Sequence, residues 1–224
     1  MARDNAPQER QRRQLERKRG RRASHDRLLI VSEGSKTEPH YFREIRAAYR
    51  LHTANVEVQP CELGTAPIQV VQYARDLFEK GDRHKRIQPR AFERVYAVFD
   101  RDDHDSYFDA LALAESLQGT LRNDNKQAIQ FQAIASVPCF ELWLLLHYAD
   151  IQAVIHRDEV MRRLRQHLPA YVKASNDVFA HTRGQLEIAT ARAQTLSAQF
   201  TAHDAPAPYT GVDALVKQLT TLRA

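Results

Sequence analysis

Four short apolar runs alternate with amphipathic stretches along the first two thirds of the chain. The runs are rich in β-branched and aromatic residues, which is typical of strands buried in a mostly parallel sheet. They cover residues 28–31, 55–61, 95–99 and 128–135. Between them, apolar residues recur with helical spacing over residues 37–49, 67–80 and 107–117. This order, with its short connections, predicts an α/β fold with a four-stranded, mostly parallel sheet and flanking helices.

The pattern changes after residue 150, where only helical spacing remains. Just before this point, residues 139–148 are apolar nearly all round, which predicts a helix central to the packing. Three more helices are expected over residues 157–167, 176–200 (with a break near Gly184) and 212–222. No strand is predicted beyond residue 150. We therefore expect a basic flexible arm (1–26), an α/β domain (27–150) and a C-terminal helical extension packed on it (151–224).

Residues 1–25 are polar and strongly basic. Such a segment has little to bury, so we expect a solvated arm. It can lie along a phosphate backbone, or it can be a flexible tail without a specific role. On the first interpretation, the nucleic-acid-binding candidates are Lys36, in the turn after the first strand, and Arg17, Lys18, Arg19, Arg21 and Arg22 in the arm.

The composition and charge of the chain favour an anionic partner. Hydrophobic residues at 43% and charged residues at 27% are ordinary for a globular protein, so the chain as a whole is expected to fold. The net charge of +5 and the pI near 9.3 favour an anionic partner, of which nucleic acid is the commonest. No stretch has the length needed to span a bilayer, and the first residues lack the apolar part of a signal peptide. We expect a cytoplasmic protein without a membrane partner.

Acidic residues directly follow two of the predicted strands. The third run ends in the stretch DRDD at residues 100–103, and Glu33 follows the first run. If the extended conformation continues, Asp100 and Asp102 point to the same side. Two carboxylates at the carboxyl end of a parallel strand suit a hard divalent cation such as Mg²⁺. The alternative is an acidic loop in which the Asp residues form turns and cap the next helix.

Three stretches together resemble a known protein family. They read LIVSEGSKTEPHYF (residues 29–42), VFDRDDH (98–104) and SVPCFELWLLLHY (136–148). In this order they are similar to the signature blocks of the RloB family, and the Glu-Gly turn and the Asp-x-Asp have the order and placement of a Toprim domain. The resemblance implies a Toprim-like fold in which Glu33, Asp100 and Asp102 hold Mg²⁺ (or Mn²⁺). It also implies a place beside restriction-modification and abortive-infection genes of prokaryotes, often with a partner ATPase.

Two further residues are candidates for a catalytic role. Glu141 lies in the first turn of the apolar helix, where the helix dipole stabilises its charge. Because a carboxylate at a buried surface needs a partner, contact with the metal site or with Lys36 is an alternative explanation. Lys173 either stabilises a developing phosphate charge or is an ordinary solvated lysine. The candidate catalytic set is Glu33, Asp100, Asp102, Glu141 and Lys173.

Two functions fit these observations. The first is a Mg²⁺-dependent nuclease that cleaves phosphodiester bonds of DNA or RNA in a prokaryotic anti-phage or abortive-infection system. The second is a non-catalytic nucleic-acid-binding or regulatory subunit of a partner ATPase. The chain has no Gly-x-x-x-x-Gly-Lys-[Ser/Thr] motif, so ATP hydrolysis would come from that partner. The sequence leaves the oligomeric state open.

Overall fold

The computed structural model describes residues 26–53, 55–173 and 177–222. The predicted basic arm, with Arg17, Lys18, Arg19, Arg21 and Arg22, lies outside these residues. Its contact with nucleic acid therefore stays a prediction. Within the described part of the chain, none of the helices is both long enough and apolar enough to cross a membrane.

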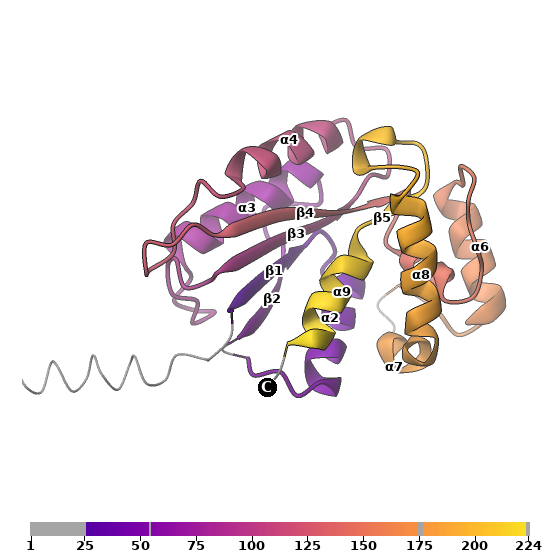
Figure 1. Cartoon of the computed structure of the whole chain (residues 1–224), viewed down its shortest axis with the longest axis horizontal. Helices are drawn as coiled ribbons and strands as arrows, with labels where there is room; N and C mark the ends of the chain where they lie inside the picture. Colours follow the sequence, from indigo (N-terminus) through magenta and orange to yellow (C-terminus); the bar gives the residue numbers. More distant parts are fainter. Residues whose placement is uncertain (1–25, 54, 174–176, 223–224) are drawn as a thin grey trace, which may run out of the picture.

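A five-stranded sheet forms the centre of the structure (Figure 1). Its strands, in spatial order, are β2 (Val56–Pro60), β1 (Leu28–Ser32), β3 (Arg94–Asp100), β4 (Gln130–Val137) and β5 (Tyr209–Thr210). The first four are parallel. Every residue of β1 and nearly every residue of β3 is buried, as their continuous apolar runs predict. The α/β fold with a mostly parallel sheet and flanking helices is confirmed.

The predicted count of four strands is wrong, because β5 adds a fifth. This strand runs antiparallel to β4, with Thr210 opposite Ser136, and the two hydroxyl oxygens lie 3.1 Å apart in a hydrogen bond. A strand of two residues is too short to show an alternating pattern, so pairing with β4 decides its conformation. The expectation of helices alone after residue 150 is therefore also wrong at Tyr209 and Thr210.

Helices cover both faces of the sheet (Figure 1). On one face, α3 (Pro67–Lys80) and α4 (Tyr107–Leu117) share an apolar core with one set of alternate strand residues, among them Leu29 and Val95. On the other face, α2 (Thr37–Ala48) and α9 (Val212–Thr221) pack on the complementary set, which includes Ile30 and Tyr96. The long apolar runs of the strands are thus buried from both sides.

A group of helices beside α9 completes the fold, at the right of Figure 1. Its members are α5 (Glu141–Leu146), α6 (Arg157–His167), α7 (Val178–Thr182) and α8 (Leu186–Ser197). A 3₁₀ turn at Arg183–Gln185 separates α7 from α8, which confirms the predicted break near Gly184. One continuous apolar core joins this group to β1, β3 and α2. The residues after position 150 are therefore built into the same core as the sheet.

α5 lies in the interior, as its apolar sequence predicts. All six of its residues are buried, and the Trp143 indole N–H donates a hydrogen bond of 2.8 Å to the Tyr41 hydroxyl. The helix is shorter than the predicted 139–148, because the preceding residues form tighter turns. The N–H of Leu142 bonds to the carbonyl three residues earlier, at Cys139, and Trp143 does the same with Phe140. Glu141 thereby becomes the first residue of the helix.

Candidate metal centre

Acidic side chains gather where β1, β3 and β4 end. β1 and β3 are neighbours, with Ser32 paired to Val98, so Glu33 emerges beside the end of β3. Asp100 is the last residue of β3, and Glu141 follows β4 after a short turn. This is the edge of a parallel sheet at which ligands bind in open α/β folds.

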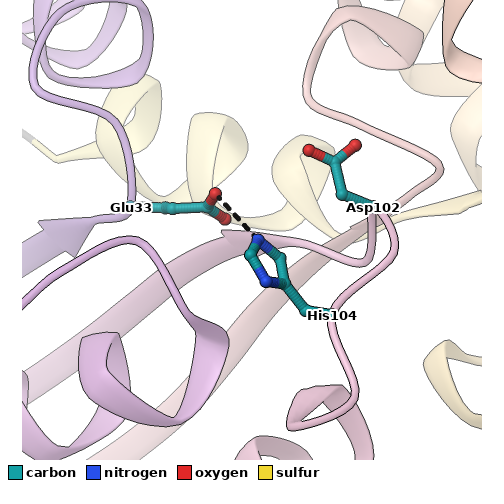
Figure 2. Close-up of side chains that lie close together, drawn as sticks. All are labelled: Glu33, Asp102 and His104. Carbon is teal, nitrogen blue, oxygen red and sulfur yellow. Dashed lines mark ion pairs between the residues drawn. The ribbon is translucent and has the colours of Figure 1, made fainter.

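Glu33, Asp102 and His104 each bring one potential ligand atom to a common point (Figure 2). These three atoms lie within 4.8 Å of one another, and Glu33 Oε1 is 3.7 Å from His104 Nε2. The second carboxylate oxygen of Glu33 accepts a hydrogen bond of 3.0 Å from the backbone N–H of Asp100. That bond orients the Glu33 carboxylate towards the other two side chains. We call these three residues the ligand trio.

The backbone turn at Asp102 explains why this residue joins the trio. β3 ends at Asp100, and Asp102 has a φ of 36°, which a residue other than glycine seldom adopts. Hydrogen bonds from the N–H groups of Arg101 and Asp102 to the carbonyls of Ser136 (2.8 Å) and Pro138 (3.1 Å) hold the turn. The argument from strand alternation therefore does not apply to Asp102, because the extended conformation stops before it.

The two carboxylate oxygens of Asp102 have different surroundings. Oδ2 lies 2.6 Å from Arg157 Nη1, in an ion pair with the first residue of α6. Oδ1 is buried and has no hydrogen-bond partner. Leaving a buried carboxylate oxygen without a partner is unfavourable. A cation beside Oδ1 would satisfy it.

Asp100 lies deeper than the trio. Its side chain is buried, and burial together with the charges of Glu38, Glu33 and Glu141 raises its pKa well above the usual value. The residue stands in the same electrostatic environment as the trio, but its carboxylate is not among the three atoms that meet within 4.8 Å. The three predicted residues Glu33, Asp100 and Asp102 therefore lie at one site, where Asp100 is more deeply buried than the ligand trio.

Glu38 is a further buried carboxylate, in the first turn of α2. Burial, and then the charges of Glu141 and Glu33, raise its pKa to about 7. Its carboxylate lies against Gly34, so closely that a side chain at that position would collide with it. The glycine of the turn after β1 therefore leaves room for Glu38 to enter the site.

Glu141 and Lys173, both predicted candidates, lie near each other. The buried Glu141 Oε1 accepts a hydrogen bond of 3.1 Å from the Tyr171 hydroxyl and is 3.9 Å from Lys173 Nζ. The Lys173 side chain is half exposed. Lys36, the alternative partner considered for Glu141, is an exposed residue at the start of α2. The described partners of the Glu141 side chain thus include Tyr171 and Lys173, and also the thiol of Cys139.

Negative charge exceeds positive charge at this site. Five carboxylates, which we call the acidic cluster, interact there: Glu33, Glu38, Asp100, Asp102 and Glu141. The permanent cations acting on them are Arg157 and Lys173. Burial, followed by the charge of Asp102, raises the pKa of Glu33 to about 7, although the bond from the Asp100 N–H opposes this shift. Burial also raises the pKa of Asp102, against the effect of Arg157. Such a cluster favours an additional cation.

A comparison with protein-family models identifies the family of this chain. The model described as RloB-like protein matches residues 28–219. The chain belongs to the RloB-like family. The resemblance predicted from the three sequence blocks is thereby confirmed, and the match contains the whole acidic cluster of this RloB-like protein with both of its cations. Neither a curated protein nor a solved structure matches the chain.

The residues of the RloB-like protein fit a divalent cation. Carboxylate oxygens are the ligands preferred by Mg²⁺ and Mn²⁺, and the buried Oδ1 of Asp102 lacks a hydrogen-bond partner. His104 adds a nitrogen ligand, which transition metals accept more readily than Mg²⁺ does. Glu33, Asp102 and His104 would hold such an ion, and the other carboxylates would surround it.

Besides Glu38, sequence reasoning missed three residues of the site, namely His104, Arg157 and Tyr171. His104 carried a usable signal, because it lies two residues after Asp102 and His is a common metal ligand. The sequence carries no such signal for Arg157 or Tyr171, because each contacts a site residue that is distant in the sequence. Lys36 is exposed, and its binding to nucleic acid remains a prediction.

Proposed function

We propose that this RloB-like protein is a divalent-metal-dependent nuclease that cleaves phosphodiester bonds in DNA or RNA. The observation that carries the proposal is the ligand trio, with an unpartnered carboxylate oxygen of Asp102 beside it. A glutamate after β1 and an Asp-x-Asp after β3 also agree with a Toprim-like centre. The metal would be Mg²⁺ or Mn²⁺.

Four residues of the site have a stated role in this proposal: Glu33, Asp100, Asp102 and Lys173. When bound, the cation supplies Lewis acidity and a water molecule of lowered pKa. Glu33 and Asp102 place negative charge around the ion, while the backbone N–H of Asp100 keeps Glu33 in position. In the metal-free protein the pKa of Glu33 is about 7, so a proton competes with the cation for this carboxylate near neutral pH. Lys173 would offset charge that develops on the phosphate.

The biological setting in the proposal comes from the family. The resemblance implies an anti-phage or abortive-infection system of prokaryotes, with a partner ATPase and a cytoplasmic location. The chain lacks a P-loop motif, so the partner would hydrolyse ATP. In this setting Lys36 and the basic arm would bind the nucleic-acid backbone.

A second candidate is a non-catalytic subunit that binds nucleic acid or regulates the partner ATPase. The ion pair of 2.6 Å between Arg157 and Asp102 favours it, because the guanidinium already offsets part of the negative charge of the Asp102 carboxylate without a metal. In this case the acidic cluster serves the stability of the fold or a contact with the partner.

The two candidates differ in whether purified protein cuts nucleic acid. We expect the full chain, incubated with Mg²⁺ or Mn²⁺ and with its partner ATPase, to shorten labelled DNA or RNA, and EDTA to stop the reaction. Single-stranded DNA, double-stranded DNA and structured RNA are each assayed with and without the partner. Intact substrate in every reaction would contradict the nuclease and favour the regulatory subunit.

A further inference from the structure

A small cavity adjoins the candidate metal centre through Asp102. Its volume is about 140 Å³, and its polar residues are Arg101, Asp102, Asp103, His156 and Arg157. Glu33 and His104 do not line it, so Asp102 separates the cavity from the rest of the ligand trio. Pockets for drug-sized ligands begin at about 300 Å³. The cavity therefore suits a small group rather than a whole nucleoside.

Arg101 lines this cavity and has one hydrogen-bond donor without a partner. Its Nη1 donates a hydrogen bond of 3.0 Å to the backbone carbonyl of Asp102, whereas its Nε is buried without a hydrogen-bond partner. A guanidinium stays charged at any physiological pH, and a buried charged donor without a partner is costly. Because Nε is buried and Arg101 lines the cavity, a small rotation of the side chain would let an anion bound there supply the missing acceptor.

Arg157 contributes a second guanidinium. One of its five donors is used by Asp102, at 2.6 Å. Its side chain is 34% exposed and lines the cavity. Planar guanidinium groups bind phosphate through paired hydrogen bonds. A phosphate group has enough oxygens to accept hydrogen bonds from both guanidinium groups at once, and it is small enough for a cavity of this size.

We propose that Arg101 and Arg157 form a phosphate subsite that holds a phosphate of the nucleic-acid strand beside the metal centre. The identification of the strand rests on the proposed nuclease function, whereas the anion binding itself does not. In this arrangement Arg157 bridges the two parts of the site, because it contacts both the cavity and the ligand Asp102. A strand anchored there would place a neighbouring phosphodiester bond near the ligand trio.

Asp102 and Asp103 both bring negative charge to this subsite, but Asp102 is paired with Arg157. Asp103 is exposed and also lines the cavity, so its charge repels a bound phosphate. Replacing it with Asn removes that repulsion at nearly constant shape. Tighter phosphate binding by the Asp103→Asn variant cannot result from damage to the fold, and this makes it a useful counterpart to the arginine variants.

Titration calorimetry of the full chain with inorganic phosphate, in EDTA, tests the subsite. We expect Arg101→Gln and Arg157→Gln each to weaken binding about tenfold to a hundredfold, because each loses a charge-assisted hydrogen bond. Arg165→Gln, which removes an exposed arginine of the same helix α6 outside the cavity, should leave the affinity unchanged. Asp103→Asn should bind phosphate more tightly than the wild type.

Phosphate affinity equal to wild type in both cavity-arginine variants would overturn the subsite. So would an Asp103→Asn variant that binds no more tightly. A short single-stranded oligonucleotide should displace phosphate from the wild type. Displacement by a nucleoside monophosphate but not by the oligonucleotide would overturn the assignment to a strand.

The subsite and the proposed nuclease can fail separately. If the arginine variants lose phosphate binding while the wild type cuts no nucleic acid, the subsite proposal is supported and the nuclease proposal is rejected. If the wild type cuts nucleic acid but both arginine variants bind phosphate as tightly as the wild type, the nuclease proposal is supported and the subsite proposal is rejected.

Discussion

Asp102→Asn is expected to lower the rate of metal-dependent nucleic-acid cleavage by about a hundredfold or more. The amide keeps the size of the side chain but removes the charge that a divalent cation requires. Asn also tolerates a positive φ, so the turn at position 102, with its φ of 36°, should persist. The rate is measured under single-turnover conditions at saturating protein, so that weaker substrate binding does not enter the comparison.

Asp109→Asn is the matched control for this change. Asp109 is an exposed residue in the first turn of α4 and belongs to neither the ligand trio nor the acidic cluster. Its replacement should leave the rate within about twofold of the wild type, in line with the small effects of surface substitutions. A similar rate in the wild type and the Asp102→Asn variant would show that cleavage does not depend on this carboxylate.

Glu38→Gln is expected to stabilise the metal-free protein above pH 7 by about 1–3 kcal/mol. Burial is the chief cause that raises the pKa of Glu38 to about 7 in the folded state, from its ordinary value of 4.5. Above pH 7 the carboxylate is charged in both states, so the folded state bears the unfavourable burial and repulsion, which Gln removes. Between pH 7 and 4.5 the folded wild type binds a proton before the unfolded chain does. The advantage of the variant therefore shrinks over this range and is lost near pH 4.5.

Urea unfolding in EDTA at several pH values measures this difference. Glu187→Gln, at an exposed position of α8, makes the same chemical change away from the acidic cluster and should alter stability little at any pH. A Glu38→Gln variant that is less stable than the wild type at pH 8 would mean that the Glu38 charge is compensated in the folded protein.

Local sequence patterns were sufficient to predict the parallel strands and most helices. β1 and β3 are apolar over nearly their whole length, and this pattern arises because helices cover both faces of the sheet. The same runs located Glu33 and Asp100, since each lies at the end of a strand. The signal is local in each case, so it can be read before the fold is known.

Other parts of the site depend on contacts between distant segments. Arg157 reaches Asp102 across 55 positions, and Tyr171 reaches Glu141 across 30. Neither contact has a pattern in the sequence, because it exists only once the helices after residue 150 pack against the sheet. β5 was missed for the same reason, as β4 determines its extended conformation.

Asp102 was correctly predicted to lie at the site, although the argument from strand alternation was incomplete. Alternation along a strand predicted its direction, yet the strand ends two residues earlier. Its position is set instead by a left-handed turn bonded to the end of β4. Because that turn depends on the β3–β4 pairing, the sequence identified the residue but not the reason for its place.

Binding of Mn²⁺ to the metal-free full chain tests the central claim most directly, because it needs neither a substrate nor a partner. Electron paramagnetic resonance follows the free ion during a titration of the wild type, Glu33→Gln and the exposed control Glu187→Gln. We predict saturable binding by the wild type and the control, and an affinity at least about tenfold lower for Glu33→Gln, which loses a charged ligand of the trio. Equal Mn²⁺ affinity in the wild type and Glu33→Gln, or no binding by the wild type, would contradict a metal centre at this site.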